Sequence, residues 1–296
     1  MNDLYFDSVG KRIKLSIKEG FDLDKLLMQQ YIPSLNISDS AERVDYSIQI
    51  MEGNPLFDFD RERAVYTTPD LNNKDVMALL SRYFEYLFFR EGKYSVHSSA
   101  FCCDDKATII AGRSGAGKTT LLLKLLEKDS ELEVISGDRT LINGDYALGG
   151  TRVINVKGSS LLYEFPELGR RIAIEEDTEA QKQIKLTEDG SPFRYCSERA
   201  TIKRIIYPFK TSGKLEVKQL GYPERLTRFV NQAFHFLDEF PRVLLGGQMF
   251  LSTAITEDEK NLALKQMNTL VSRVDSYAIS GSLDDMQKWI TETLLE

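Results

Sequence analysis

The sequence predicts an α/β fold, and three of its features support that prediction. Residues 1–70 hold short strand-like segments separated by turn signals. A glycine-rich loop stands between an apolar strand and a helix in the middle of the chain, and apolar stripes with helical spacing dominate the last third. A chain of 296 residues, 42% hydrophobic and 28% charged, has the composition of a folded protein with one or two domains.

The first 93 residues are expected to form a small α+β region, and a second domain is expected at 94–296. Strands are indicated at Arg12–Ile17 and Val44–Ile50, and turns at Gly53–Pro55 and Pro69–Asp70. A short helix is indicated near Asp22–Gln30. A longer helix follows, because apolar residues recur at steps of three and four. These residues are Val76, Leu79, Leu80, Tyr83, Phe84, Leu87 and Phe88, and Gly92 is a natural end.

A β-hairpin is expected next, with strands Tyr94–Cys103 and Ala107–Ala111 around the polar turn Asp104–Asp105. With a two-residue turn, paired residues have numbers that sum to 209, as 104 and 105 do, so His97 lies opposite Gly112. A turn displaced by one residue would place the imidazole opposite Ser114 instead. Either register holds it near the loop that follows, where it can orient a carboxylate or donate to an oxyanion. A histidine that only pairs with the backbone of its strand is the alternative.

The loop itself fits the phosphate-binding pattern G-x-x-x-x-G-K-[ST] over residues 112–119. The apolar strand Thr108–Ala111 precedes it, and the helix Thr119–Glu127 follows, which is the context that the motif requires. Loop amides and the helix N-terminus favour an anion, Lys118 would reach the β- and γ-phosphates, and the Thr119 hydroxyl would ligate magnesium. The residues expected to bind the nucleotide are Gly112, Ser114, Gly115, Ala116, Gly117, Lys118, Thr119 and Thr120.

A carboxylate for the metal is expected at Asp138. Val134–Ile135 is a short apolar strand, and Asp138 stands with Gly137 at its end, twenty residues after Lys118. One helix and one returning strand fill that separation, so the two side chains are expected to be neighbours. Phosphoryl transferases need such a carboxylate beside the loop, which makes Thr119 and Asp138 the predicted metal ligands. The alternative is an aspartate that only forms a turn beside glycine.

Composition restricts the partners and the cellular location that we expect for the protein. The net charge is 38 − 45 = −7, which weighs against nucleic acid as a partner. No secretory leader and no long apolar run are apparent, so no membrane association is expected. The cysteines Cys102, Cys103 and Cys196 are interpreted as free thiols in a reducing compartment, and we expect a cytoplasmic protein. Because the adjacent pair has no second pair, no structural zinc site is expected.

The last third is expected to be mostly helical. One apolar stripe comprises Leu226, Phe229, Val230, Ala233, Phe234 and Leu237, and another comprises Leu264, Met267, Leu270, Val271 and Val274. Ser282 with Asp285 three residues later resembles the capping box of a final helix.

His97, the loop that begins fifteen residues later at Gly112, and the apolar strand ending in Gly137–Asp138 together resemble the catalytic core of HPr kinase. The resemblance is best over residues 94–145 and weaker over Arg152–Phe229. The wider group includes phosphoenolpyruvate carboxykinase and stand-alone kinases that phosphorylate peptides or small molecules. The resemblance implies an HPr kinase/phosphoenolpyruvate carboxykinase-like P-loop fold with a mixed sheet, a small α+β N-terminal region and a helical C-terminus.

The resemblance also implies catalytic roles for Asp138, His97 and Lys118. The family typically has two adjacent aspartates, one acting as base toward the acceptor hydroxyl and one near the metal. Here Asp138 stands alone between Gly137 and Arg139, so its role is open between metal ligand, base, or both. The acidic-apolar segment of HPr kinase that runs into Arg-Gly-Leu-Gly has no clear counterpart, so HPr itself is not implied as the acceptor.

The expected activity is transfer of the γ-phosphate of ATP, with Mg²⁺, to a Ser-type hydroxyl of a peptide or protein. A metabolite kinase of the same fold and a nucleotide-binding switch or NTPase without transferase activity are the alternatives. A homo-oligomer is compatible with the resemblance, because HPr kinase assembles into rings. Candidates for charge stabilisation are Arg113, Arg139, Arg152 and Arg204. The aromatic segments Leu162–Pro166 and Pro192–Tyr195 are interpreted either as acceptor-pocket walls or as ordinary packing.

Overall fold

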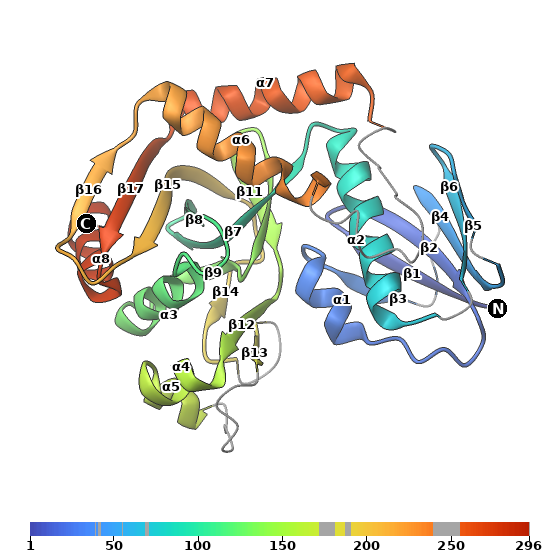
Figure 1. The fold of residues 1–296 in the computed structure, drawn as a ribbon, viewed down its shortest axis with the longest axis horizontal. Helices are drawn as coiled ribbons and strands as arrows, with labels where there is room; N and C mark the ends of the chain where they lie inside the picture. The colour runs from blue at the N-terminus through green and yellow to red at the C-terminus, as the bar shows by residue number, and fades with distance from the viewer. Residues whose placement is uncertain are drawn as a thin grey trace.

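The computed structural model describes residues 1–38, 40, 43–54, 56–68, 71–171, 181–186, 191–238 and 255–295. They form an α/β fold with two large mixed sheets and helices between and around them (Figure 1). The predicted turn Pro69–Asp70 lies outside the described residues. None of the described helices is both long and apolar enough to span a membrane.

The N-terminal sheet has six strands in the order β3-β1-β2-β4-β6-β5. Their bounds are β1 Asn2–Ser8, β2 Lys11–Ile17, β3 Asn36–Ser38, β4 Tyr46–Glu52, β5 Leu56–Phe59 and β6 Arg63–Thr68. Alternation explains its single buried face, because Ile13, Leu15 and Ile17 of β2 are all buried while the residues between them are partly exposed. The two strands predicted here are therefore confirmed to within two residues.

Two helices cover the buried face of this sheet. Helix α1 spans Lys25–Tyr31 and begins three residues later than expected, because the Asp24 side chain caps it by accepting from the Leu27 amide. Helix α2 spans Asn73–Phe89 and contains the predicted stripe. It is buried on nearly every side, since it lies between the N-terminal sheet and the central sheet (Figure 1). More of this helix is therefore buried in the core than the predicted apolar stripe indicated.

The central sheet has nine strands, and β7, its ten-residue strand, pairs with three of them. The strands are β7 Tyr94–Cys103, β8 Lys106–Ala111, β9 Glu133–Ser136, β10 Arg139–Asn143, β11 Tyr146–Gly150, β14 Arg194–Tyr195, β15 Ala200–Lys210, β16 Glu216–Gln219 and β17 Asp275–Gly281. The first residues of β7 pair with β10, and its later residues lie between β8 and β9. Strand β15 pairs in parallel with β8 and β17, which makes the sheet mixed.

Five of these strands close a circuit of hydrogen-bonded neighbours. Strand β7 pairs with β8, β8 with β15, β15 with β11, β11 with β10, and β10 again with β7. The strand that precedes the glycine-rich loop therefore has a neighbour on each side, and the loop begins from a fixed base.

The β7–β8 hairpin has the predicted register. Asp104 and Asp105 form its two-residue turn, with φ of 48° and 60°, as a type I′ turn requires. Cys103 pairs with Lys106 and Ser98 with Ala111, so each pair of numbers sums to 209. The next position along the same register places His97 opposite the start of the loop, and the alternative register displaced by one residue is wrong.

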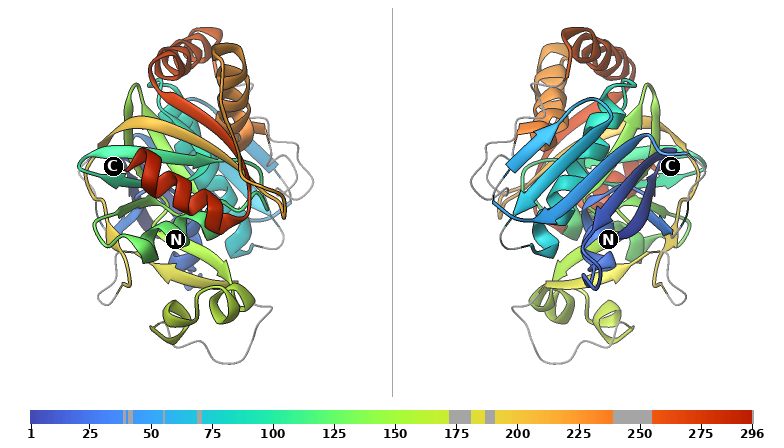
Figure 2. Two further views of the ribbon diagram at one scale, coloured as in Figure 1. Left: turned by 90° about the vertical axis from the view of Figure 1, so that its left-hand side faces the viewer. Right: turned by 90° about the vertical axis from the view of Figure 1, so that its right-hand side faces the viewer.

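Helices cover both faces of the central sheet. Their bounds are α3 Lys118–Lys128, α4 Gly158–Tyr163, α5 Pro166–Arg171, α6 Tyr222–Asp238, α7 Glu257–Arg273 and α8 Leu283–Leu294. Helices α3 and α8 pack side by side over one core (Figure 2), and α2, α6 and α7 share the other core with the N-terminal sheet. A two-stranded sheet of β12 Val153–Lys157 and β13 Gln181–Lys185 carries α4 and α5 on its flank.

The C-terminal third is less helical than expected. Strands β15, β16 and β17 lie in it, and β17 separates α7 from α8. The stripe on α7 also differs by one position, because Ala263 is buried while Leu264 is 39% exposed. The predicted cap is confirmed, since the Ser282 hydroxyl accepts from the Asp285 amide. On α6 Phe229 and Ala233 are buried as expected, and the side chains of Phe234 and Leu237 lie outside the described part of the chain.

The boundary at residue 93/94 stays a prediction. The two large sheets are separate in their hydrogen bonding, as that boundary suggests. One hydrophobic cluster nevertheless runs without interruption from Phe6 of β1 through α2 to Val96 of β7 and Leu270 of α7. The N-terminal region therefore helps to hold β7 in place.

Candidate active site

The glycine-rich loop connects the end of β8 to the start of α3. Ala111 is the last residue of β8, Lys118 is the first residue of α3, and the leucines expected on the inner side of α3 are buried. Gly115 and Gly117 have φ of 82° and 95°, where a side chain would be strained. A Cβ on Gly117 would also lie 3.1 Å from the Leu283 side chain of α8. The motif thus has a local reason for glycine at both positions.

Lys118 bends back over the loop that precedes it. Its Nζ donates to the carbonyl oxygens of Gly112 at 2.9 Å and Arg113 at 3.3 Å. The same Nζ lies 3.2 Å from Nε2 of His97. The Lys118 side chain is buried, at 6% exposure. These contacts hold its ammonium group at the opening, or mouth, of the glycine-rich loop.

His97 joins the lysine to the predicted carboxylate. Its Nε2 is 3.2 Å from Oδ1 of Asp138 as well as 3.2 Å from Nζ of Lys118. His97 comes from β7, Lys118 from α3, and Asp138 from the connection between β9 and β10. The three residues predicted as catalytic are therefore brought together around one imidazole nitrogen.

Asp138 sits in a two-residue elbow rather than at the free end of a strand. The Ser98 amide of β7 donates to the Asp138 carbonyl at 2.9 Å, and the Asp138 amide donates to Thr151 Oγ1 at 3.0 Å. A Cβ on Gly137 would approach the Val153 carbonyl oxygen to 2.1 Å, so this position accepts only glycine. This elbow explains the sequence pair Gly137–Asp138. It lets β9 and β10 both pair with β7. It also turns the Asp138 side chain, which is 39% exposed, toward the surface.

The charges of this cluster support one another. Burial tends to raise the pKa of Asp138, but the His97 hydrogen bond and the charges around it, including that of Lys118, outweigh that effect and hold the pKa below its ordinary value. Burial lowers the pKa of Lys118, and the Asp138 carboxylate opposes that effect. The carboxylate is therefore ionised at neutral pH, as a metal ligand must be.

Arg139, the residue after the carboxylate, points the other way. Its guanidinium is buried and contacts α2, with Nη1 3.1 Å from Glu85 Oε1 and 2.8 Å from Ser81 Oγ. Glu85 also accepts from Ser95 Oγ of β7 at 2.6 Å. Arg139 is therefore wrong as a candidate for charge stabilisation, because its charge is already paired with Glu85 inside the core.

The other candidate arginines differ in position. Arg152 donates to Asn36 Oδ1 at 2.9 Å and packs on the Tyr195 ring, so it fastens the N-terminal region. Arg204 lies mid-strand in β15 and is partly buried. Arg113 is exposed within the glycine-rich loop and stays a candidate.

A cavity of about 980 Å³ adjoins the glycine-rich loop. One wall is the loop itself, residues 112–116, and the opposite wall comes from β15, β16, β17 and α6. Side chains on that wall include Phe209, Lys210, Lys218, Arg228 and Asn231. The sequence analysis did not predict this wall. Its one local signal was Phe209, an aromatic residue between proline and lysine, which is 65% exposed in the structure.

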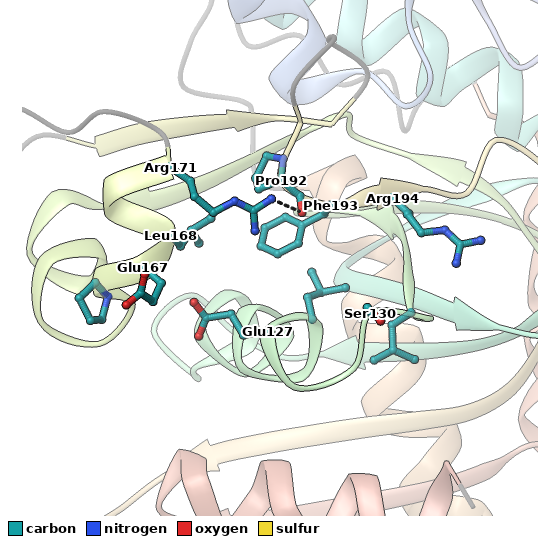
Figure 3. A pocket seen from close by; sticks show the side chains of 11 residues that line it. Glu127, Ser130, Glu167, Leu168, Arg171, Pro192, Phe193 and Arg194 are labelled. Atoms are coloured by element: carbon teal, nitrogen blue, oxygen red, sulfur yellow. Dashed lines mark hydrogen bonds between the residues drawn. The ribbon is translucent and has the colours of Figure 1, made fainter.

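A second cavity, of about 660 Å³, lies at the far end of α3 (Figure 3). Figure 3 shows Phe193 between α5 and α3, with Arg171 donating to the Pro192 carbonyl at 3.3 Å. Pro166 and residues 192–194 line it, so the two predicted aromatic segments do meet. At about 1.5 Å per residue, however, eleven residues of α3 put about 16 Å between this cavity and the loop. These segments therefore do not line the cavity beside the glycine-rich loop.

Among known proteins, neither a family model nor a curated sequence matches this chain. Candidate roles for the residues of this site are therefore assigned from its local geometry. That geometry places Thr119 and Thr120 in the first turn of α3, beside the loop amides, and gathers Lys118, His97 and Asp138 at its mouth.

Proposed function

We propose that the chain is a Mg²⁺-dependent ATP kinase that phosphorylates a hydroxyl of a peptide or protein. The observation that carries the proposal is the contact of Lys118 Nζ, His97 Nε2 and Asp138 Oδ1 at the mouth of a phosphate-binding loop. A nucleotide-binding switch needs the loop, the lysine and a carboxylate for the metal. The imidazole held against that carboxylate is what supports transfer to a hydroxyl. The resemblance to HPr kinase agrees with this assignment.

The donor set fits magnesium. The Thr119 hydroxyl and the Asp138 carboxylate are hard oxygen ligands, and the lowered pKa of Asp138 keeps it charged. Mg²⁺ at these residues would neutralise charge on the β- and γ-phosphate oxygens. The loop amides and the α3 N-terminus would hold the phosphates, with Lys118 turned from the loop carbonyls toward them.

His97 has a positioning role that follows from its single shared nitrogen. Nε2 cannot accept from Lys118 and donate to Asp138 at the same moment. In the tautomer that carries the ring proton on Nε2, the imidazole donates to Asp138 and would fix the direction of its carboxylate, while Lys118 would contact phosphate instead. In the transfer step, the acceptor oxygen bonds to the γ-phosphorus, the bond to the β–γ bridging oxygen breaks, and the acceptor proton passes to Asp138. A base of low pKa suffices, because the transition state is loose and its proton is lost late.

We assign the two substrates to two sides of the glycine-rich loop, and the position of the large cavity supports this assignment. The cavity touches the outer residues of the loop, 112–116, and we assign the nucleoside of ATP to it. Phe209 offers a face for the base, and Lys210 and Arg228 offer charge. The partly exposed Asp138 carboxylate leaves the acceptor side open, which favours a hydroxyl on a peptide or protein over an enclosed metabolite.

Transfer of radiolabelled γ-phosphate from Mg-ATP into fractionated cell extract tests the proposal. Lys118→Ala is the blank, and Asp104→Asn, the same change of charge at the far turn of the hairpin, is the matched control for Asp138→Asn. Label in a macromolecular fraction, lost in Asp138→Asn and kept in Asp104→Asn, is the expected result. Label only in small molecules would support a metabolite kinase, and release as free phosphate would support an NTPase. Tight ATP binding without any turnover would contradict the kinase.

A further inference from the structure

A second cluster of chemically active side chains lies at the other end of β7. It consists of Cys102, Glu133 and Cys196, whose two sulfurs and a carboxylate oxygen all lie within 4.8 Å of one another. Both thiols are buried, and the Glu133 side chain is 29% exposed. Nothing in the proposed kinase chemistry uses these residues.

Three neighbouring strands bring the cluster together. Cys102 of β7 is directly opposite Glu133 of β9, and Glu133 is in register with Arg194 of β14. Cys196 follows β14 and continues the pairing, since its amide donates to the Val134 carbonyl at 2.9 Å. Residues in register share a face of the sheet, and so do residues two apart on one strand. The three side chains therefore converge on one face by the register of the sheet.

We propose that Cys102, Cys196 and Glu133 bind one thiophilic divalent cation, with zinc as the best fit. Two thiolates and a carboxylate are ligands of structural and catalytic zinc sites. Magnesium and calcium take oxygen ligands and would not select two buried sulfurs. The Glu198 carbonyl oxygen, 3.3 Å from Cys196 Sγ, stands at the cluster as a candidate fourth ligand.

Packing explains two buried thiols, and Glu133 is also held by its ion pair with Arg194. The convergence of all three side chains is what suggests a cation. Buried free cysteines usually act as small apolar side chains. Here a carboxylate oxygen is within reach of both sulfurs. Three groups that are anionic when deprotonated thus face one another, which favours a cation between them.

Binding has a defined proton balance and a defined competitor. Each thiol passes its proton to the buffer as its sulfur bonds to the cation, so up to two protons leave for each ion bound. Glu133 currently pairs with Arg194, whose side chain is 56% exposed. An exposed ion pair of this kind is weak and screened by salt, so the cation displaces it readily.

The site is separate from the glycine-rich loop. Cys102 is five residues from His97 along β7, which at about 3.4 Å per residue is about 17 Å. Its physical consequence would be to fasten β14, a strand of only two residues, to β7 across β9. Metal binding at this cluster therefore does not depend on the proposed kinase activity at the glycine-rich loop.

Metal titration of the full-length, reduced, metal-free protein tests this inference. Zinc is added in competition with a chromophoric chelator, and cobalt is used as a spectroscopic probe of thiolate ligation. The variants are Cys102→Ser, Cys196→Ser and Glu133→Gln, and Cys103→Ser is the matched control, because Cys103 is adjacent in β7 but belongs to the core on the opposite face. We expect one zinc per chain, sulfur-to-cobalt charge-transfer bands, and affinity reduced by roughly a hundredfold in each site variant.

Three results of the metal titration would overturn the proposal. They are zinc binding no tighter than that of exposed carboxylates, an equal loss in Cys103→Ser, and cobalt spectra without sulfur bands. A Cys102–Cys196 disulfide that forms readily in a protein without zinc affinity would also overturn it and assign the pair to redox chemistry instead. Glu133→Gln keeps the shape of its side chain, so it keeps the test valid where a serine variant fails to fold.

Discussion

The two ends of β7 carry two clusters that were assembled in different ways. At the His97 end, an ammonium and a carboxylate meet on one imidazole, and all three residues lie within one stretch of about forty residues. At the Cys102 end, the ligands come from positions 102, 133 and 196 and meet only through the register of three strands. The first arrangement is a motif that a sequence displays. The second exists only after the sheet has formed, so spacing alone does not reveal it.

The largest expected effect is a loss of phosphate transfer that involves only the cluster at the His97 end of β7. Asp138→Asn should reduce phosphate transfer by about 10²–10⁴-fold, because the amide can neither accept the acceptor proton nor neutralise the metal. ATP affinity should stay within a few-fold of the wild type, since the loop and Lys118 are intact. Single-turnover transfer and equilibrium nucleotide binding measure the two quantities. Full transfer by Asp138→Asn would remove Asp138 from the mechanism.

A substitution in the elbow should damage both ends together. Gly137→Ala would drive a Cβ against the Val153 carbonyl, so we expect a loss of about 3 kcal/mol or more in the free energy of unfolding. The elbow joins β10, beside His97, to β9, which carries Glu133. Gly221→Ala is the control, because a Cβ there meets nothing within 4 Å. Chemical denaturation compares the two, and equal stability would show that the elbow adapts.

Zinc should stabilise the protein through the Cys102 end only. A ligand at about 100 times its dissociation constant adds about 2.7 kcal/mol to the free energy of unfolding. Thermal unfolding should show this gain in the wild type, in Asp138→Asn and in Cys103→Ser, and should show only a small part of it in Glu133→Gln. A gain that disappears in Asp138→Asn would mean that the ion binds near the glycine-rich loop.

The smallest effect is the acid dependence of the His97 end. The folded-state pKa of Asp138 is lowered, so its stabilising contribution is fully present above its unfolded pKa of about 4 and is lost as pH falls through the folded value. The difference in unfolding free energy between the wild type and Asp138→Asn should therefore shrink as the pH falls below about 4. Denaturant titrations across that range measure it, and a constant difference would contradict the depressed pKa.

Local sequence patterns were sufficient to predict the structure around the glycine-rich loop. The glycine-rich loop, the I′ turn at Asp104–Asp105 and the proximity of His97 to Lys118 all follow from sequence, because each depends on neighbours a few residues away or on one hairpin register. The proximity of Asp138 followed from chain length alone. The catalytic roles of these residues remain predictions.

Features set by long-range packing were missed. Arg139 pairs with Glu85, fifty-four positions earlier, and nothing local marks that ion pair. Strand β17 lies between two helices, where helical stripes dominated the interpretation. Burial of Ala263 rather than Leu264 depends on the direction from which α7 meets its neighbours. In each case the deciding contact is with a distant element.

The closed circuit of five strands has a consequence for how the chain reaches its structure. Strand β8 ends at Ala111, and its parallel partner β15 begins at Ala200, so almost ninety residues must be synthesised before the two can pair. Loop closure of this length is slow, and the exposed edge of β8 is open to wrong partners until it occurs. On the ribosome, we therefore expect the β7–β8 hairpin to form early and the proposed nucleotide site to be completed only late. For a chain that binds ATP as proposed, the appearance of ATP affinity would then report the completion of folding.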